Sequence, residues 1–218
     1  MRILKITPGE HYHIFNRAVN KQIIFHNTRD YIRFLFLILH FQSAIKVSHL
    51  NRAVKEFAKS LGQHSVLTID KRMVELVAFC IMPNHFHLIV KELEENGIAS
   101  YMQRVLNAYG KYYNTKYEKT GHVFQGPYRA VHISDDRQLL YLSAYIHRNP
   151  REISRWFRKE DQYIWSSYQD FIGENRWSDM LMPDIVRGQF KNHQKYHEFV
   201  KTNPAKLIEG ELDYLGSL

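Results

Sequence analysis

Residues 77–90 read VAFCIMPNHFHLIV, two apolar runs separated by Pro83 and Asn84. Their length and apolar content predict two β-strands, over residues 75–81 and 85–91. So short a connection predicts a hairpin. Pro83 cannot donate a hydrogen bond to a strand ladder, so the turn should have irregular geometry. We expect the second strand to be central in a sheet.

His85 and His87 lie two residues apart in the second strand. Successive side chains of a strand alternate between its faces, so the two imidazoles should project side by side while Phe86 points the other way. Two neutral imidazoles on one face supply half of a divalent-metal site. The alternative is that two histidines share a strand by chance, and ligands elsewhere in the chain have to decide between the two.

The composition is that of a globular protein with one domain, or one domain with an appendage: 218 residues, 44% hydrophobic and 24% charged. The net charge of +8 and a pI near 9.4 favour a polyanionic partner such as nucleic acid, although a solvated basic surface would give the same values. A single cysteine, Cys80, excludes an internal disulfide framework and favours a reducing, cytoplasmic location. We find no apolar run long enough to cross a bilayer and no signal-peptide core, so no membrane association is expected.

The rest of the chain predicts alternating strands and helices. Further strands are expected over residues 11–19 and 128–133, and helices over residues 31–40, 98–113 and about 135–149, where Pro150 stops continuation. The order β-α-(α)-β-β-α-β-α indicates an α+β fold, a ferredoxin-like antiparallel sheet with helices on one face. Residues 42–71 read as a polar insertion, and residues 174–218 as a C-terminal helical extension.

Tyr145 and Asn149 stand four residues apart near the end of the last of these helices, so they should share one helix face. The amide oxygen of Asn149 is a suitable third ligand for a hard divalent cation, Mg²⁺ or Mn²⁺, held by His85 and His87. The Tyr145 hydroxyl would then face whatever the metal polarises, and a polarised phosphodiester is a target for an activated tyrosine. The alternatives are a core tyrosine and an ordinary helix-terminal asparagine.

Several motifs resemble those of one known family. MPNHFHL at residues 82–88 is similar to the His-hydrophobic-His motif of the single-tyrosine HUH transposases of the IS200-like superfamily. YIHRNP at residues 145–150 is similar to the Tyr-Ile-x-x-Asn-Pro motif of their REP-associated branch. Further matching pieces are HYHIFNR at residues 11–17, GHVFQG at residues 121–126 and WSSY at residues 165–168. The resemblance covers about residues 8–173, but residues 42–71 look longer than its pattern and the chain beyond residue 171 has no counterpart in it.

The resemblance implies a nuclease domain over residues 1–173 that cleaves and rejoins single-stranded DNA, usually at hairpins. It assigns His85, His87 and Asn149 to the divalent metal, and Tyr145 to the nucleophile that forms a covalent 5′-phosphotyrosine. A homodimer is expected from the same resemblance.

Basic side chains near these motifs are candidates for contacts with DNA phosphates. They are Arg17, Arg129, His147 and Arg148. For the last two, an exposed helix end that favours positive charge is an equally good explanation.

Other arrangements stay open. Tyr112 or Tyr113 could replace Tyr145 as the nucleophile, but neither is followed at i+4 by a strong ligand. His11 and His13 repeat the His-x-His spacing without an apparent third ligand or nucleophile. The chain could also be a domesticated protein that binds hairpin DNA or RNA without cutting it, or a metal-dependent nuclease that uses water.

Overall fold

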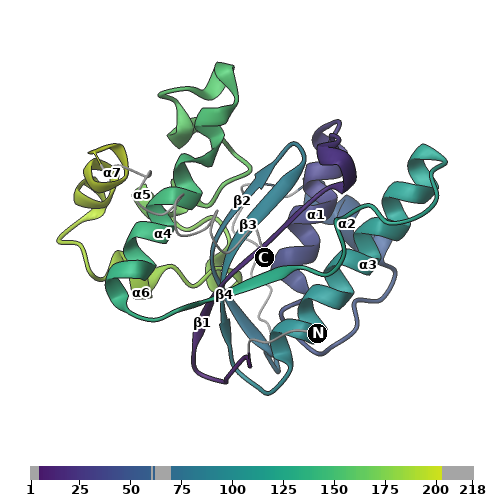
Figure 1. Cartoon of the computed structure of the whole chain (residues 1–218), viewed down its shortest axis with the longest axis horizontal. Coiled ribbons are helices and arrows are strands. Elements are labelled where there is room, and N and C mark those ends of the chain that lie inside the picture. The colour runs from purple at the N-terminus through teal and green to yellow at the C-terminus, as the bar shows by residue number, and fades with distance from the viewer. Residues whose placement is uncertain (1–4, 60, 62–69, 203–218) are drawn as a thin grey trace.

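A computed structural model describes residues 5–59, 61 and 70–202 of the chain. Four strands form one antiparallel sheet in the order β2-β3-β1-β4 (Figure 1). They are β1 (His11–Arg17), β2 (Val74–Met82), β3 (His85–Glu92) and β4 (Arg129–Ile133). β2 and β3 form the predicted hairpin, and β3 is a central strand, as expected.

Two long helices pack on the face of the sheet that carries Phe86. α1 (Thr28–His40) begins at a capping box made by Asn27 and Asp30, and α3 (Gly97–Tyr117) follows β3. The Phe34 ring of α1 lies 5.0 Å from the Phe86 ring and 5.2 Å from the Tyr109 ring of α3, measured between centroids. A shorter helix, α2 (Leu50–Lys59), lies within the predicted insertion. The α+β class and the ferredoxin-like order of elements are thereby confirmed.

Helix α4 (Asp136–Arg148) lies against the opposite face of the sheet. It begins at Asp135, whose side chain accepts a hydrogen bond from the Gln138 N–H. α1 and α3 form the expected helical face, and α4 adds a cover on the other side. The physical reason is the nearly unbroken apolar run of β2, in which Phe79 and Cys80 point to opposite faces and are both fully buried.

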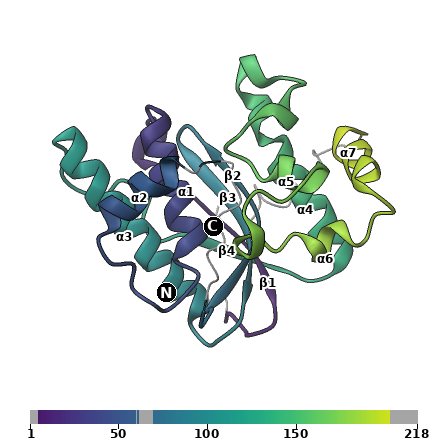
Figure 2. The same ribbon diagram turned by 180° about the vertical axis from the view of Figure 1, so that it is seen from behind.

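The chain after α4 is built from short helices, several of which contact α4 (Figure 2). They are the 3-10 helices η2 (Asn149–Glu152), η3 (Ser154–Trp156), η4 (Glu160–Gln162) and η5 (Ser178–Met180), and the α-helices α5 (Tyr168–Ile172), α6 (Asp184–Arg187) and α7 (His193–Thr202). A further 3-10 helix, η1 (Val19–Lys21), follows β1. Residues 203–218 of the predicted extension and residues 60 and 62–69 of the predicted insertion lie outside the described residues. The boundary at residue 173 stays a prediction.

Candidate functional site

The register of the sheet gathers polar side chains on the face that α4 covers. Directly paired residues of neighbouring strands point to the same face of the sheet. His85 and His87 of β3 pair with Arg17 and Phe15 of β1, and Phe15 in turn pairs with Arg129 of β4. The shared face carries His13, Phe15 and Arg17 of β1, His85 and His87 of β3, and Arg129 of β4.

Hydrogen bonds assign the tautomer of His85. The side-chain Nδ2 of Asn84 donates to the Lys21 carbonyl at 2.8 Å, which leaves Asn84 Oδ1 to face His85 Nδ1 at 2.7 Å. Because a carbonyl oxygen only accepts, His85 carries its proton on Nδ1. Burial, aided by the positive charge of Arg17, lowers the pKa of His85 to about 4. The ring is therefore neutral at neutral pH, with a lone pair on Nε2.

Asn149 places a second acceptor opposite that lone pair. Its Nδ2 donates to the Tyr145 carbonyl at 3.1 Å, so its Oδ1 is turned toward His85 Nε2, 3.4 Å away. Both residues are buried, and the two facing atoms are acceptors with no proton assigned between them. Two ligands bound at right angles to one ion at about 2.1 Å are about 3 Å apart. The pair thus has the chemistry and nearly the spacing of two ligands of a cation.

His87 has a partner that the sequence did not reveal. Its Nδ1 lies 2.9 Å from Nε2 of His13, and the two rings stack with centroids 5.1 Å apart. Burial lowers the pKa of His13 to about 3 and holds the pKa of His87 well below its usual value, so both rings are neutral at neutral pH. When His87 donates from Nδ1 to His13, its Nε2 is left with a lone pair for a metal.

Tyr145 stands beside these histidines as predicted. Its half-buried ring meets the ring of His87 edge to face, with the centroids 5.6 Å apart. The alternative nucleophiles belong to α3, on the other side of the sheet: Tyr112 donates to Asp30 at 2.8 Å, and the Tyr113 hydroxyl lies 3.2 Å from His26. The structure therefore brings Tyr145, and neither of the alternatives, to the histidine pair.

The four candidate DNA contacts have different surroundings. Arg17 and Arg129 are exposed on the site's own face, and Arg148 is half-buried at the end of α4. His147 is fully buried, with Nδ1 2.6 Å from the Tyr196 hydroxyl and Nε2 2.9 Å from Ser167 Oγ. The predicted contact between His147 and a DNA phosphate is wrong in this fold, because α7 and the residues before α5 cover that side of α4.

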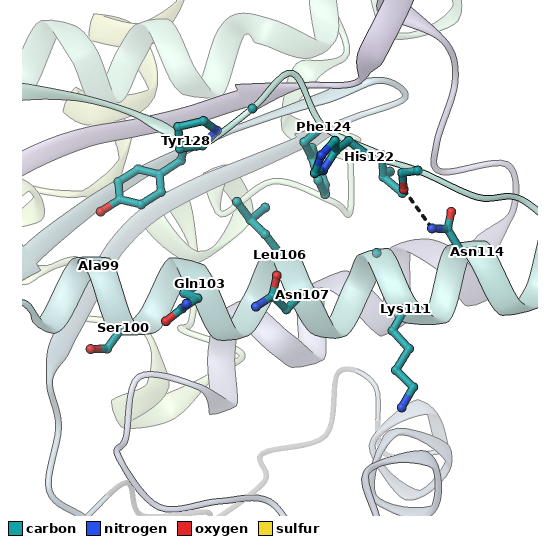
Figure 3. A pocket seen from close by; sticks show the side chains of 15 residues that line it. Ala99, Ser100, Gln103, Leu106, Asn107, Lys111, Asn114, His122, Phe124 and Tyr128 are labelled. Atoms are coloured by element: carbon teal, nitrogen blue, oxygen red, sulfur yellow. Dashed lines mark hydrogen bonds between the residues drawn. The ribbon is translucent and has the colours of Figure 1, made fainter. Parts of the chain in front are cut away.

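The candidate ligand set consists of two imidazoles and one amide oxygen. Within residues 5–59, 61 and 70–202, no group of three or more His, Cys, Asp or Glu side chains is placed to hold a metal. A separate groove of about 860 Å³ lies on the α3 side of the sheet, between α3 and residues 121–128 (Figure 3). Gln103, Asn107 and Lys111 line it, together with His122, but none of the predicted site residues does.

Three features together define the class: the four-stranded sheet, strand β3 with His85 and His87, and helix α4 with Tyr145. They are those of an α+β protein with the layout of a single-tyrosine HUH transposase. The particular family is given by comparison with family models, where residues 37–149 match the one described as "Transposase IS200 like". The match spans more than half of the chain, which therefore belongs to the IS200-like transposase family.

Among solved structures, the chain is similar to a REP-associated tyrosine transposase bound to a REP hairpin. The TM-score is 0.54 at 14% sequence identity, over 85% of this chain and 92% of that chain, and this likeness shows the fold. The search of curated proteins gave no match. In the described part of the chain, no helix has the length and apolar character needed to cross a membrane.

Proposed function

We propose that this transposase cleaves and rejoins single-stranded DNA at hairpin sites through a covalent 5′-phosphotyrosine on Tyr145, with the help of a divalent metal. The observation that carries the proposal is the pair of acceptors, His85 Nε2 and Asn149 Oδ1, which face each other at 3.4 Å beside Tyr145. Membership of a transposase family supports the reaction class.

The residues present fit a divalent metal. His85 and His87 are neutral and buried, and Asn149 adds a hard oxygen, a mixed set that Mn²⁺ and Mg²⁺ accept. When bound, the metal would withdraw negative charge from the non-bridging oxygens of the phosphate and from the leaving oxygen.

The side chains of the site account for the rest of the reaction. The Tyr145 oxygen attacks phosphorus, a tyrosine–phosphate bond forms, and the bond to the 3′ oxygen breaks. The phenol proton leaves, and the departing strand takes up a proton to end in a 3′ hydroxyl. Arg17 and Arg129 lie on the same face and can pair with the flanking phosphates. Rejoining is the reverse attack by a 3′ hydroxyl, and it needs no external energy because the phosphotyrosine retains the energy of the phosphodiester.

Further predictions from the sequence belong to this proposal. We propose that the chain is of the REP-associated branch, that residues 1–173 form the nuclease domain, and that the protein acts in the cytoplasm as a homodimer. The hairpin substrate has its support in the solved relative, which is bound to a REP hairpin.

The test is an end-labelled hairpin oligonucleotide with a single-stranded flank, incubated with the protein and Mn²⁺. A DNA–protein adduct that survives denaturation is expected with the wild type, none with Tyr145→Phe, and a normal yield with the control Tyr112→Phe. Cleavage without an adduct would indicate a hydrolytic nuclease, binding without cleavage a domesticated binding protein, and an equal yield from Tyr145→Phe would refute the assignment.

A further inference from the structure

Residues 151–160 form an arm that follows Asn149 and Pro150 in the chain. The arm projects beyond the C-terminal end of α4, at the end of the sheet where β3 begins, in the views from both sides (Figures 1 and 2). His85 is the first residue of β3, so the arm lies toward the end of the molecule that holds the candidate metal ligands. Its sequence, REISRWFRKE, carries three arginines and a lysine.

The tip of the arm is a tight turn with an unusual residue in it. The Lys159 N–H donates to the Trp156 carbonyl at 2.8 Å, Phe157 has φ −57° and ψ 122°, and Arg158 has φ +62°. This is the geometry of a type II turn, in which the third position favours glycine. An arginine in a left-handed conformation costs on the order of 1 kcal/mol. The stability of the turn therefore does not explain why residue 158 is an arginine.

The turn presents an aromatic ring to solvent between two cations. Phe157 is 51% exposed, and the guanidinium carbons of Arg151 and Arg158 lie 5.9 and 5.4 Å from its ring centroid. An apolar protein partner would have to bury the guanidinium charge of Arg158 together with the ring, which is costly. A nucleotide offers what the turn can accept: a flat base to stack on the ring and a phosphate for the guanidinium groups.

The base of the arm holds the turn in place. Glu160 is buried, and its Oε1 accepts hydrogen bonds from Arg151 Nε at 2.6 Å and from the Arg158 backbone N–H at 3.3 Å. The buried carboxylate therefore ties the start of the arm, at Arg151, to the turn residue Arg158. A preformed turn loses little conformational freedom when it binds a ligand.

We propose that the arm binds the single-stranded DNA next to the candidate cleavage site. An unpaired base stacks on Phe157, and the adjoining phosphates pair with Arg158 and Lys159. The inference rests on the proposed function, since the strand held by the arm is the one that Tyr145 would cut, and it adds a binding surface to that function.

The first experiment measures DNA affinity in EDTA, so that no cleavage takes place. Two labelled hairpins are compared by fluorescence anisotropy, one with a single-stranded flank and one with a blunt end. Phe157→Ala should weaken binding of the flanked hairpin about tenfold and leave the blunt hairpin unchanged, because one stacked base is lost. Phe157→Trp should retain the affinity. The control is Ile45→Ala, which removes a side chain of similar exposure, 53%, that does not belong to the arm.

The second experiment separates charge from structure. Arg158→Gly suits the left-handed position, so thermal stability should be unchanged or higher while affinity for the flanked hairpin falls. The slope of log affinity against log salt should become shallower by about 0.7, the value for one phosphate contact on a single strand.

The outcomes distinguish this inference from the proposed function. Wild-type affinity for the flanked hairpin in both Phe157→Ala and Arg158→Gly would overturn the role of the arm. A change in oligomeric state on Phe157→Ala, without a change in DNA affinity, would overturn it in favour of an interface between copies. A wild-type protein that binds neither hairpin would refute the proposed function itself.

Discussion

His85 Nε2 and Asn149 Oδ1 face each other at 3.4 Å, and the surrounding hydrogen bonds make both atoms acceptors. Asn149→Ala should therefore weaken Mn²⁺ binding at least about tenfold, because one ligand is lost. Asn149→Asp should strengthen it, since a carboxylate adds negative charge. Isothermal titration calorimetry checks both. Tyr145→Phe is the control and should bind Mn²⁺ like the wild type, and wild-type affinity in Asn149→Ala would exclude Asn149 as a ligand.

His13 should set the orientation and tautomer of His87. His13→Phe keeps a ring at this position but removes the nitrogen that lies 2.9 Å from His87 Nδ1. We expect Mn²⁺ affinity to fall about tenfold, the usual effect of losing a partner of a metal-ligating histidine. The matched control is His11→Phe, two residues earlier on the same strand, which should bind Mn²⁺ normally. Equal affinities for the two variants would show that His13 is only a packing residue.

Tyr196 of α7 should hold α4, the helix that carries Tyr145, against the C-terminal part of the chain. Its buried hydroxyl lies 2.6 Å from His147 Nδ1 and donates to Ser143 Oγ at 3.1 Å, and both partners belong to α4. Tyr196→Phe leaves His147 Nδ1 without its partner, so the free energy of unfolding should fall by about 1–3 kcal/mol. Urea unfolding measures this. The control is Tyr141→Phe. Tyr141 belongs to α4, and its ring packs on Phe199 of α7, the helix that also carries Tyr196. If residues 174–202 unfolded separately from α4, urea unfolding would show two transitions, which would contradict this role of Tyr196.

Acid should destabilise the protein through His40. Burial lowers the pKa of His40 to about 4, although a hydrogen bond to the Phe36 carbonyl opposes the shift. The folded state therefore binds fewer protons than the unfolded state, whose pKa is near 6.5. The stabilising contribution is complete above pH 6.5 and decreases as the pH falls toward 4.

Between pH 7 and pH 5, His40 alone should account for a loss on the order of 1 kcal/mol. His40→Asn should lose less stability over this interval than the wild type, as measured by urea unfolding at the two pH values. An identical pH dependence in the variant would contradict a lowered pKa at this position.

The sequence predicted the fold well where periodicity and length decide it. The hairpin around Pro83, the capped helix after Asn27 and the helix that carries Tyr145 all lie close to their expected positions. These elements are specified by contacts within the hairpin or within the helix itself. Such local contacts are visible in the hydrophobic pattern of the sequence. The division of helices between two faces of the sheet was not anticipated, because an apolar strand does not say what covers each side.

The candidate site could be predicted only in part for the same reason. His85 and His87 share a face by strand geometry, and Tyr145 and Asn149 by helix geometry. The pairing of His13 with His87 depends on the register between β1 and β3, which joins residues 74 positions apart. His147 was misplaced because nothing near it in the sequence shows that Tyr196 and Ser167 close over it.

In the proposed function, His85, His87 and Asn149 hold one divalent cation next to Tyr145. The most direct measurement is an anomalous difference map from a crystal of the protein soaked in Mn²⁺. We predict a single strong peak between His85 Nε2, His87 and Asn149 Oδ1, which disappears in crystals of Asn149→Ala. A map with Mn²⁺ bound elsewhere and no peak between these three side chains would contradict the account.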